Sequence, residues 1–189
     1  MHLQFPILPD SKADLDSMLS AARRHVKDYL LAALHAVFQK FTAASDPAPL
    51  DVAQKHMLRL MDEEARDRTE NENLIVLQAS LFFIMAKETS GPGKNQSIIA
   101  YGFAHTIASR LNLHYNEEPD PREVLKQNGR RAWLMLITLE RWHSVSMVDL
   151  AKVHESNVKL HLSDRKLLGE PAYHLFREFV SELSLVQAN

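Results

Sequence analysis

Apolar side chains recur every three to four positions along most of this chain, which is the period of an α-helix with one buried face. Between residues 15 and 41 the repeat is almost unbroken, and Ser11 precedes it as an N-cap. We therefore predict helical structure here, with a break near Ala21. The same period predicts a second amphipathic helix over residues 52–61.

Further along the chain the helical pattern becomes more apolar. Residues 74–88 are apolar on most faces, and their number favours a buried helix over a strand. Residues 98–113 form another helical segment, in which small residues on one face allow a neighbouring helix to approach closely: Ala100, Ala104 and Ala108. Residues 130–147 are apolar nearly all round, as in a central, fully covered helix that begins or resets near Gly129.

The segments between these helices complete an all-α interpretation. Pro171 opens a last helix, and residues 158–162 alternate like a short extended segment. Turns are predicted at Asp46-Pro47-Ala48-Pro49 and Gly91-Pro92-Gly93. Residues 62–73 are dense in charge, which indicates a solvated helix end and connector, with a docking surface as the alternative. We predict a bundle of stacked antiparallel helices, about seven in number, with little or no sheet.

Composition narrows the class of protein. The 189 residues predict a single domain over 1–189. A formal net charge of −2 gives no electrostatic footprint for nucleic acid or an anionic membrane. The absence of cysteine excludes disulfides and thiolate metal sites and fits a reducing compartment. Because no signal peptide or membrane span is evident, we expect a soluble intracellular protein without membrane contact.

Motifs for catalysis are also missing. The ten histidines include no pair with the spacing of a helical metal site, and there is no Gly-x-Ser-x-Gly elbow. Gly91-Pro92-Gly93-Lys94 lacks the spacing of a phosphate-binding loop. We therefore expect no catalytic, cofactor-binding or metal-ligating residues, and no enzyme.

One acid stands out within the apolar segment 130–147. Glu140 projects onto its most apolar face, where an unpartnered carboxylate costs several kcal/mol. We predict a buried polar clamp that fixes helix register, in which His143 and Ser144 hydrogen-bond the Glu140 carboxylate along the same face and Arg110 or Arg141 supplies the positive charge. The alternative is a ligand-sensing acid in a helical pocket.

Three motifs in this order resemble a known family. They are the segment from Ala100-Tyr101-Gly102-Phe103-Ala104 to Leu111-Asn112-Leu113-His114, then Arg130-Arg131-Ala132-Trp133, then Leu139-Glu140-Arg141-Trp142-His143. Together with Phe5-Pro6-Ile7-Leu8 they resemble the middle homology region of fungal transcription factors of the binuclear-zinc-cluster type. The signature residues are Arg110, Arg130, Arg131, Trp133, Glu140, Arg141 and His143. Arg141-Trp142-His143, Leu167-Leu168-Gly169-Glu170 and Tyr173-His174-Leu175 look more like the branch that regulates sugar-transport genes.

The resemblance implies an all-α regulatory domain of a nuclear protein, acting through a DNA-binding segment or other transcriptional proteins, with a small-molecule effector as a further partner. The chain departs from the family in three ways. The six zinc-binding cysteines are absent, so zinc and direct DNA contact belong to the family and not to this chain. Glu140 stands where the family has aspartate, and Met147-Val148-Asp149 replaces Gly-Arg-Pro. We expect either a fragment of a longer regulator or a chain that has lost its zinc cluster.

Two other classes of function compete with this interpretation. A helical scaffold or adaptor without a transcriptional role would expose a large apolar patch. A small-molecule-binding helical enzyme would require ionisable residues that converge in a pocket.

Overall fold

A computed structural model of the chain describes residues 7–42, 48–63, 67–89, 94–115, 118, 120, 122–147 and 158–186. Within these ranges the chain forms eight α-helices and a short 3-10 helix, and no strand. The predicted all-α class is therefore confirmed. The turn predicted at residues 91–93, the first half of the turn at 46–49, and the family motifs at 5–6 and 148–149 lie outside the described residues.

The chain divides into two compact units. One comprises residues Ser11–Leu111, and the other comprises Met1–Asp10 together with Asn112–Asn189. Each unit is described by itself below. The single regulatory domain expected over 1–189 stays a prediction.

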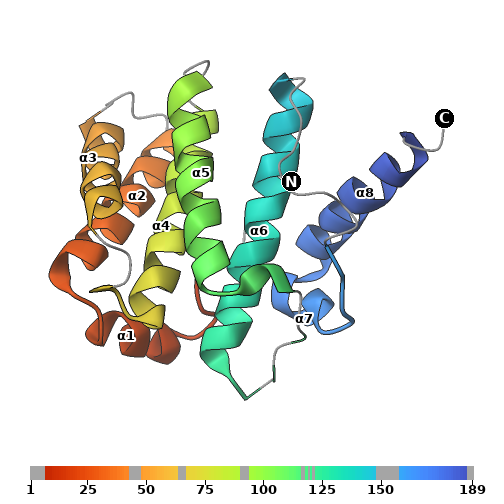
Figure 1. The fold of residues 1–189 in the computed structure, drawn as a ribbon, viewed down its shortest axis with the longest axis horizontal. Coiled ribbons are helices and arrows are strands. Elements are labelled where there is room, and N and C mark those ends of the chain that lie inside the picture. Colours follow the sequence, from red (N-terminus) through yellow and green to blue (C-terminus); the bar gives the residue numbers. More distant parts are fainter. Residues whose placement is uncertain are drawn as a thin grey trace. The chain divides into compact units, whose positions relative to one another are not determined.

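The unit Ser11–Leu111 is built around one buried helix. It contains α1 (Lys12–Ser20), α2 (Arg24–Phe41), α3 (Ala48–Asp62), α4 (Glu70–Glu88) and α5 (Lys94–Arg110). Helix α4 packs against α2, α5 and α3, and α2 also packs against α3 (Figure 1). Every residue of α4 from 72 to 84 is buried, as the apolar composition of residues 74–88 predicts.

Local sequence signals place the ends and faces of these helices correctly. The Ser11 hydroxyl oxygen accepts a hydrogen bond from the Asp14 amide at 3.0 Å, which confirms the predicted N-cap. The break predicted near Ala21 is the turn between α1 and α2. On α5 the three small residues are completely buried, so the face predicted for close helix packing faces inward: Ala100, Ala104 and Ala108.

The second unit is organised on the long helix α6. It contains η2 (Leu113–Tyr115), α6 (Val124–Met147), α7 (Asp164–Leu168) and α8 (Glu170–Val186), and α6 contacts η2, α7 and α8 (Figure 1). Residues 128–141 are buried without exception, which confirms the predicted cover on all faces for most of the segment 130–147, whereas Trp142 is 52% exposed. Gly169 has a φ of 74°, a conformation that favours glycine, and it separates α7 from α8.

The structure corrects the predicted boundary at Gly129. Helix α6 begins at Val124 and runs through Gly129 without a reset. A Cβ atom at Gly129 would lie 2.9 Å from Cδ2 of Leu113. The glycine therefore lies against the Leu113 side chain of η2 and does not mark a helix end.

Two further boundaries differ from prediction. Helix α3 begins at Ala48 and includes Pro49, so the second half of the predicted turn is already helical. Proline is tolerated there because the first turn of a helix has no partner for its amide. The five-residue helix α7 follows the non-helical residues 158–161 and is not predicted by the pattern. It is too short to display a helical period.

The charged segment 62–73 includes the end of α3 and the connection to α4, as predicted, but it is solvated only in part. Its last residues form the first turn of α4, and three of its polar side chains are buried: Arg68, Glu72 and Asn73. Charge density alone does not reveal burial when the charges pair with one another.

Candidate functional site

Arg130 forms a buried ion pair within the second unit. Its Nε donates to Oδ1 of Asp164 at 3.0 Å, and its Nη2 donates to Oδ2 at 2.9 Å and to the carbonyl of Lys159. The amide of His161 donates to the same carboxylate at 2.8 Å. The side chain of Asp164 is fully buried and that of Arg130 is 4% exposed. This bidentate arrangement joins α6 to the N-terminus of α7. It also supplies acceptors to most of the buried N–H groups of the Arg130 guanidinium.

Arg131, the next residue of α6, has a different role. Its Nη1 donates to the carbonyl of Leu8 and its Nη2 to Oδ2 of Asp10, both at 2.6 Å. The neighbouring Ile7 is completely buried. The two adjacent arginines therefore hold two segments of the chain that are far from α6 in sequence.

Other signature residues of α6 are also inaccessible. Glu140 is 4% exposed, so its inward orientation agrees with the periodicity argument. Arg141, His143 and Trp133 are buried as well. The Ser144 hydroxyl donates to the main-chain carbonyl of Glu140 at 2.9 Å, and not to its carboxylate as proposed. Arg110 is exposed at the end of α5. Its pairing with Glu140 stays a prediction.

Sequence reasoning missed a polar network in the unit Ser11–Leu111. Glu72 accepts hydrogen bonds from Nε, Nη2 and the amide of Arg23 at 2.7, 3.1 and 3.0 Å. It also closes a capping box, because its carboxylate accepts from the Thr69 amide while its own amide donates to the Thr69 hydroxyl. The signal was present in the sequence, since Thr69-x-x-Glu72 matches the capping-box pattern ahead of an apolar run.

The electrostatics of this network follow from its geometry. Burial alone raises the pKa of Glu72, but the hydrogen bonds from Arg23 and Thr69 outweigh burial and bring the pKa to about 2. The same carboxylate raises the pKa of Arg23. Glu72 is therefore ionised at neutral pH although it is buried.

Arg68 extends the network towards α3. Its Nε donates to Oδ1 of Asn73 at 3.0 Å, and its Nη1 donates to the carbonyl of Leu60 at 2.8 Å. Nη1 also lies 3.8 Å from the Glu63 carboxylate, which in turn lies 3.2 Å from Nε2 of His25. Burial lowers the pKa of Arg68; the charge of Glu63 opposes this shift, and the positive charges of Arg23 and Arg110 reinforce it. The buried Nη2 atom has no hydrogen-bond acceptor within the described residues.

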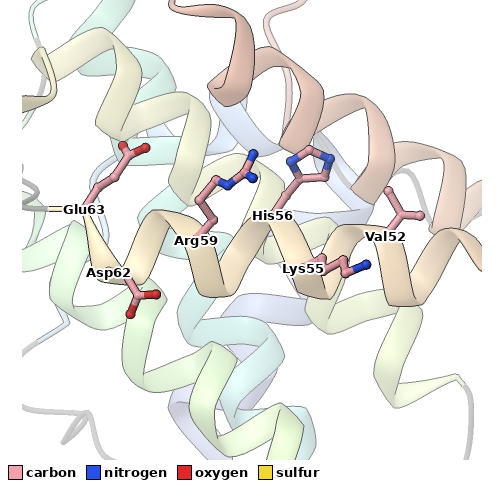
Figure 2. A pocket seen from close by; sticks show the side chains of 6 residues that line it. All are labelled: Val52, Lys55, His56, Arg59, Asp62 and Glu63. Atoms are coloured by element: carbon pink, nitrogen blue, oxygen red, sulfur yellow. The ribbon is translucent and has the colours of Figure 1, made fainter.

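Two pockets open beside α3. The first, of about 550 Å³, follows the outer side of the helix and is lined by Val52, Lys55, His56, Arg59, Asp62 and Glu63. Figure 2 shows His56, Arg59 and Glu63 projecting from the same side of α3. The second, which we call the α3–α5 pocket, has about 730 Å³ and is lined by Met61, Asp62, Glu63, Arg68, Ile99, Gly102, Phe103, Thr106, Ile107 and Arg110. Of these two pockets, the α3–α5 pocket is the one lined by a buried charged side chain, that of Arg68.

Two further observations concern chemistry that the sequence argues against. In the described parts of the chain, no group of three or more histidine, aspartate or glutamate side chains is arranged to hold a metal ion. Likewise, none of the described helices combines the length and apolar character that crossing a bilayer requires.

Comparison with known proteins gives one informative relative. Over an alignment of 185 positions that covers 89% of the chain, it is 28% identical to a protein of the fission yeast Schizosaccharomyces pombe described as an uncharacterized transcriptional regulatory protein. The chain spans only 21% of the length of that relative. No protein-family model matches the chain. No solved structure matches it either.

Proposed function

We propose that this chain is a regulatory, non-DNA-contacting part of a fungal transcription regulator. The observation that carries the proposal is the similarity to the fission-yeast transcriptional regulatory protein along 89% of the chain. The all-helical fold and the motif order from Arg110 to His143 agree with a middle homology region. The chain has no cysteine and a net charge of −2, so we assign DNA binding to other parts of the regulator or to its partners.

On this proposal the chain acts through protein contacts in the nucleus and responds to an effector. We assign it no catalytic activity and no resident metal. The zinc of the family would be held by a segment that contains cysteines. Arg130 and Arg131 would act as structural residues, because both guanidinium groups donate hydrogen bonds to other parts of the same unit.

A tethering experiment tests this role. The 189-residue chain is fused to a DNA-binding module of known operator and expressed in yeast with a reporter behind that operator. We expect a change in reporter output of at least threefold, in either direction, relative to the module alone. Ala79→Asp is the matched control, because it places a charge at a completely buried position of α4 and should remove the effect together with the fold.

Unchanged reporter output would contradict the proposal. A fusion that is nuclear, folded and as abundant as the module alone, yet leaves reporter output unchanged, would reject the transcriptional role. Copurification of the same chain with a non-transcriptional assembly would then favour the helical-adaptor alternative.

A further inference from the structure

The α3–α5 pocket contains a buried cationic group whose bonding is incomplete. The side chain of Arg68 is only 1% exposed, and two of its three guanidinium nitrogens bond to the Asn73 side chain and the Leu60 carbonyl. The third, Nη2, has no acceptor in the described part of the chain. An unsatisfied buried donor is destabilising by about 1–3 kcal/mol, more for a charged group. Because Nη2 is closed to solvent, Arg68 acts on the pocket through its uncompensated positive charge and not through a hydrogen bond to a ligand.

A second guanidinium lines the same pocket. Arg110 lies at the end of α5, and the structure assigns it no hydrogen bond or ion pair within the described residues. Its charge is close enough to Arg68 to lower the pKa of that residue. Two like charges that border one space repel each other, and an anion between them removes that repulsion. Arginine is also the side chain whose planar donors best match a carboxylate.

The rest of the lining restricts the charge and shape of the ligand. Asp62 and Glu63 border the pocket as well, so a monoanion suits it better than a doubly charged phosphate. The walls from α5 are largely apolar: Ile99, Phe103 and Ile107. The volume of about 730 Å³ lies within the usual range for small-molecule sites.

We infer that the α3–α5 pocket binds a small monocarboxylic acid with an apolar body, with the carboxylate on the exposed Arg110, the buried positive charge of Arg68 behind it, and the body against α5. Thr106 does not compete for the carboxylate, because its hydroxyl already donates to the carbonyl of Gly102 at 2.9 Å. This inference deepens the proposed regulatory role by naming the chemical class of an effector. It rests on that role only for its biological meaning.

Gly102 provides a test that leaves the buried network intact. A Cβ atom at this position of α5 would meet nothing within 4 Å, so larger side chains can enter the pocket without a clash. Gly102→Leu should fill the space that the ligand body needs, whereas Gly102→Ala adds only one methyl group. Both substitutions favour the helix, since alanine and leucine have higher helix propensity than glycine. Arg68 is unsuitable for substitution because it also holds α3 to the start of α4.

The measurement uses the full 189-residue chain with carbon-13-labelled isoleucine methyl groups. Octanoate serves as the probe, 1-octanol has the same body without the charge, and inorganic phosphate has charge without the body. We expect saturable shifts of the Ile99 and Ile107 signals with octanoate, at least tenfold weaker binding of 1-octanol, and no binding of phosphate. Arg110→Gln should weaken octanoate binding at least fivefold, Gly102→Leu should abolish it, and Gly102→Ala should retain it.

Several outcomes would overturn the inference. Equal affinity for octanoate and 1-octanol would show that the pocket binds apolar chains without recognising the carboxylate. Octanoate binding that survives Gly102→Leu would place it elsewhere. Tighter binding of an acidic peptide than of octanoate would assign the pocket to a protein partner. Because binding is measured without transcription, a failed reporter experiment with intact octanoate binding would reject only the proposed function.

Discussion

Each of the two units buries a carboxylate, but the partners that stabilise the charge differ in their exposure to solvent. In the unit Ser11–Leu111, Glu72 pairs with Arg23, whose side chain is 43% exposed, and with the backbone of its own helix turn. In the second unit, Asp164 is fully buried and its partner Arg130 is nearly so. Buried pairs depend on their partner far more than partly solvated pairs do, because a lone buried charge has no water to replace the lost contact. We therefore expect the two acids to differ sharply when one partner is removed.

The largest effect is expected at Asp164. Asp164→Ala leaves Arg130 without its carboxylate and should destabilise this unit by about 3–5 kcal/mol. The double variant Arg130→Met with Asp164→Leu should recover much of that loss, because a well-packed apolar pair carries no desolvation cost. Urea denaturation followed by tryptophan fluorescence reports on this unit, since both tryptophans, Trp133 and Trp142, lie on α6.

The neighbouring pair Arg165–Glu170 is a matched control. Its atoms are 2.7 Å apart, but both side chains are more than half exposed. Glu170→Gln should leave the urea midpoint unchanged. If Asp164→Ala and Glu170→Gln behaved alike, burial would not be what distinguishes the pairs.

An intermediate effect is expected at Glu72. Its pKa of about 2 lies below the ordinary value of 4.5, so the ionised form stabilises the fold above about pH 4.5. That contribution is lost as the pH falls from about 4.5 through 2. Since Arg23 is nearly half exposed, we expect Glu72→Gln to cost roughly 1–3 kcal/mol at pH 7.

A pH series measures this contribution directly. Denaturation monitored by circular dichroism at pH 7, 5, 3 and 2 should show the wild-type advantage over Glu72→Gln shrinking only below pH 5. Glu70→Gln is the control, because Glu70 occupies the same first turn of α4 but is exposed. A constant difference between wild type and Glu72→Gln across the series would contradict the depressed pKa.

A smaller effect isolates the cap from the ion pair. Thr69→Ala removes the hydroxyl that accepts from the Glu72 amide and should cost about 1 kcal/mol. Thr69→Ser keeps an acceptor at the same position and should cost little. Hydrogen exchange at the Glu72 amide provides the readout, with faster exchange expected in Thr69→Ala alone. Equal exchange in both variants would mean that the cap contributes nothing measurable.

These residues also show what the sequence could and could not reveal. Periodicity placed the helices and the inward face of α6, because both depend on neighbours three and four positions apart. The Thr69–Glu72 cap is equally local, but the charge density around it favours a solvated connector and masks the capping pattern. The Arg130–Asp164 pair spans 34 residues, and no local rule selects a partner across that distance. An inward-facing charge is therefore predictable, whereas its partner is not.

The smallest effect should come from Asp10, which pairs with the other arginine of α6. Asp10 lies 2.6 Å from Arg131 but its side chain is 79% exposed. Such a pair typically contributes 0–1 kcal/mol and is screened by salt, so Asp10→Asn should shift stability by no more than about 0.5 kcal/mol and by less in 0.5 M salt. Arg131→Met should cost more than Asp10→Asn, because it also removes the hydrogen bond to the Leu8 carbonyl. Urea midpoints at low and high salt separate the two. A large, salt-independent loss in Asp10→Asn would mean that exposure does not weaken ion pairs in this unit, and the contrast between Glu72 and Asp164 would then need another cause.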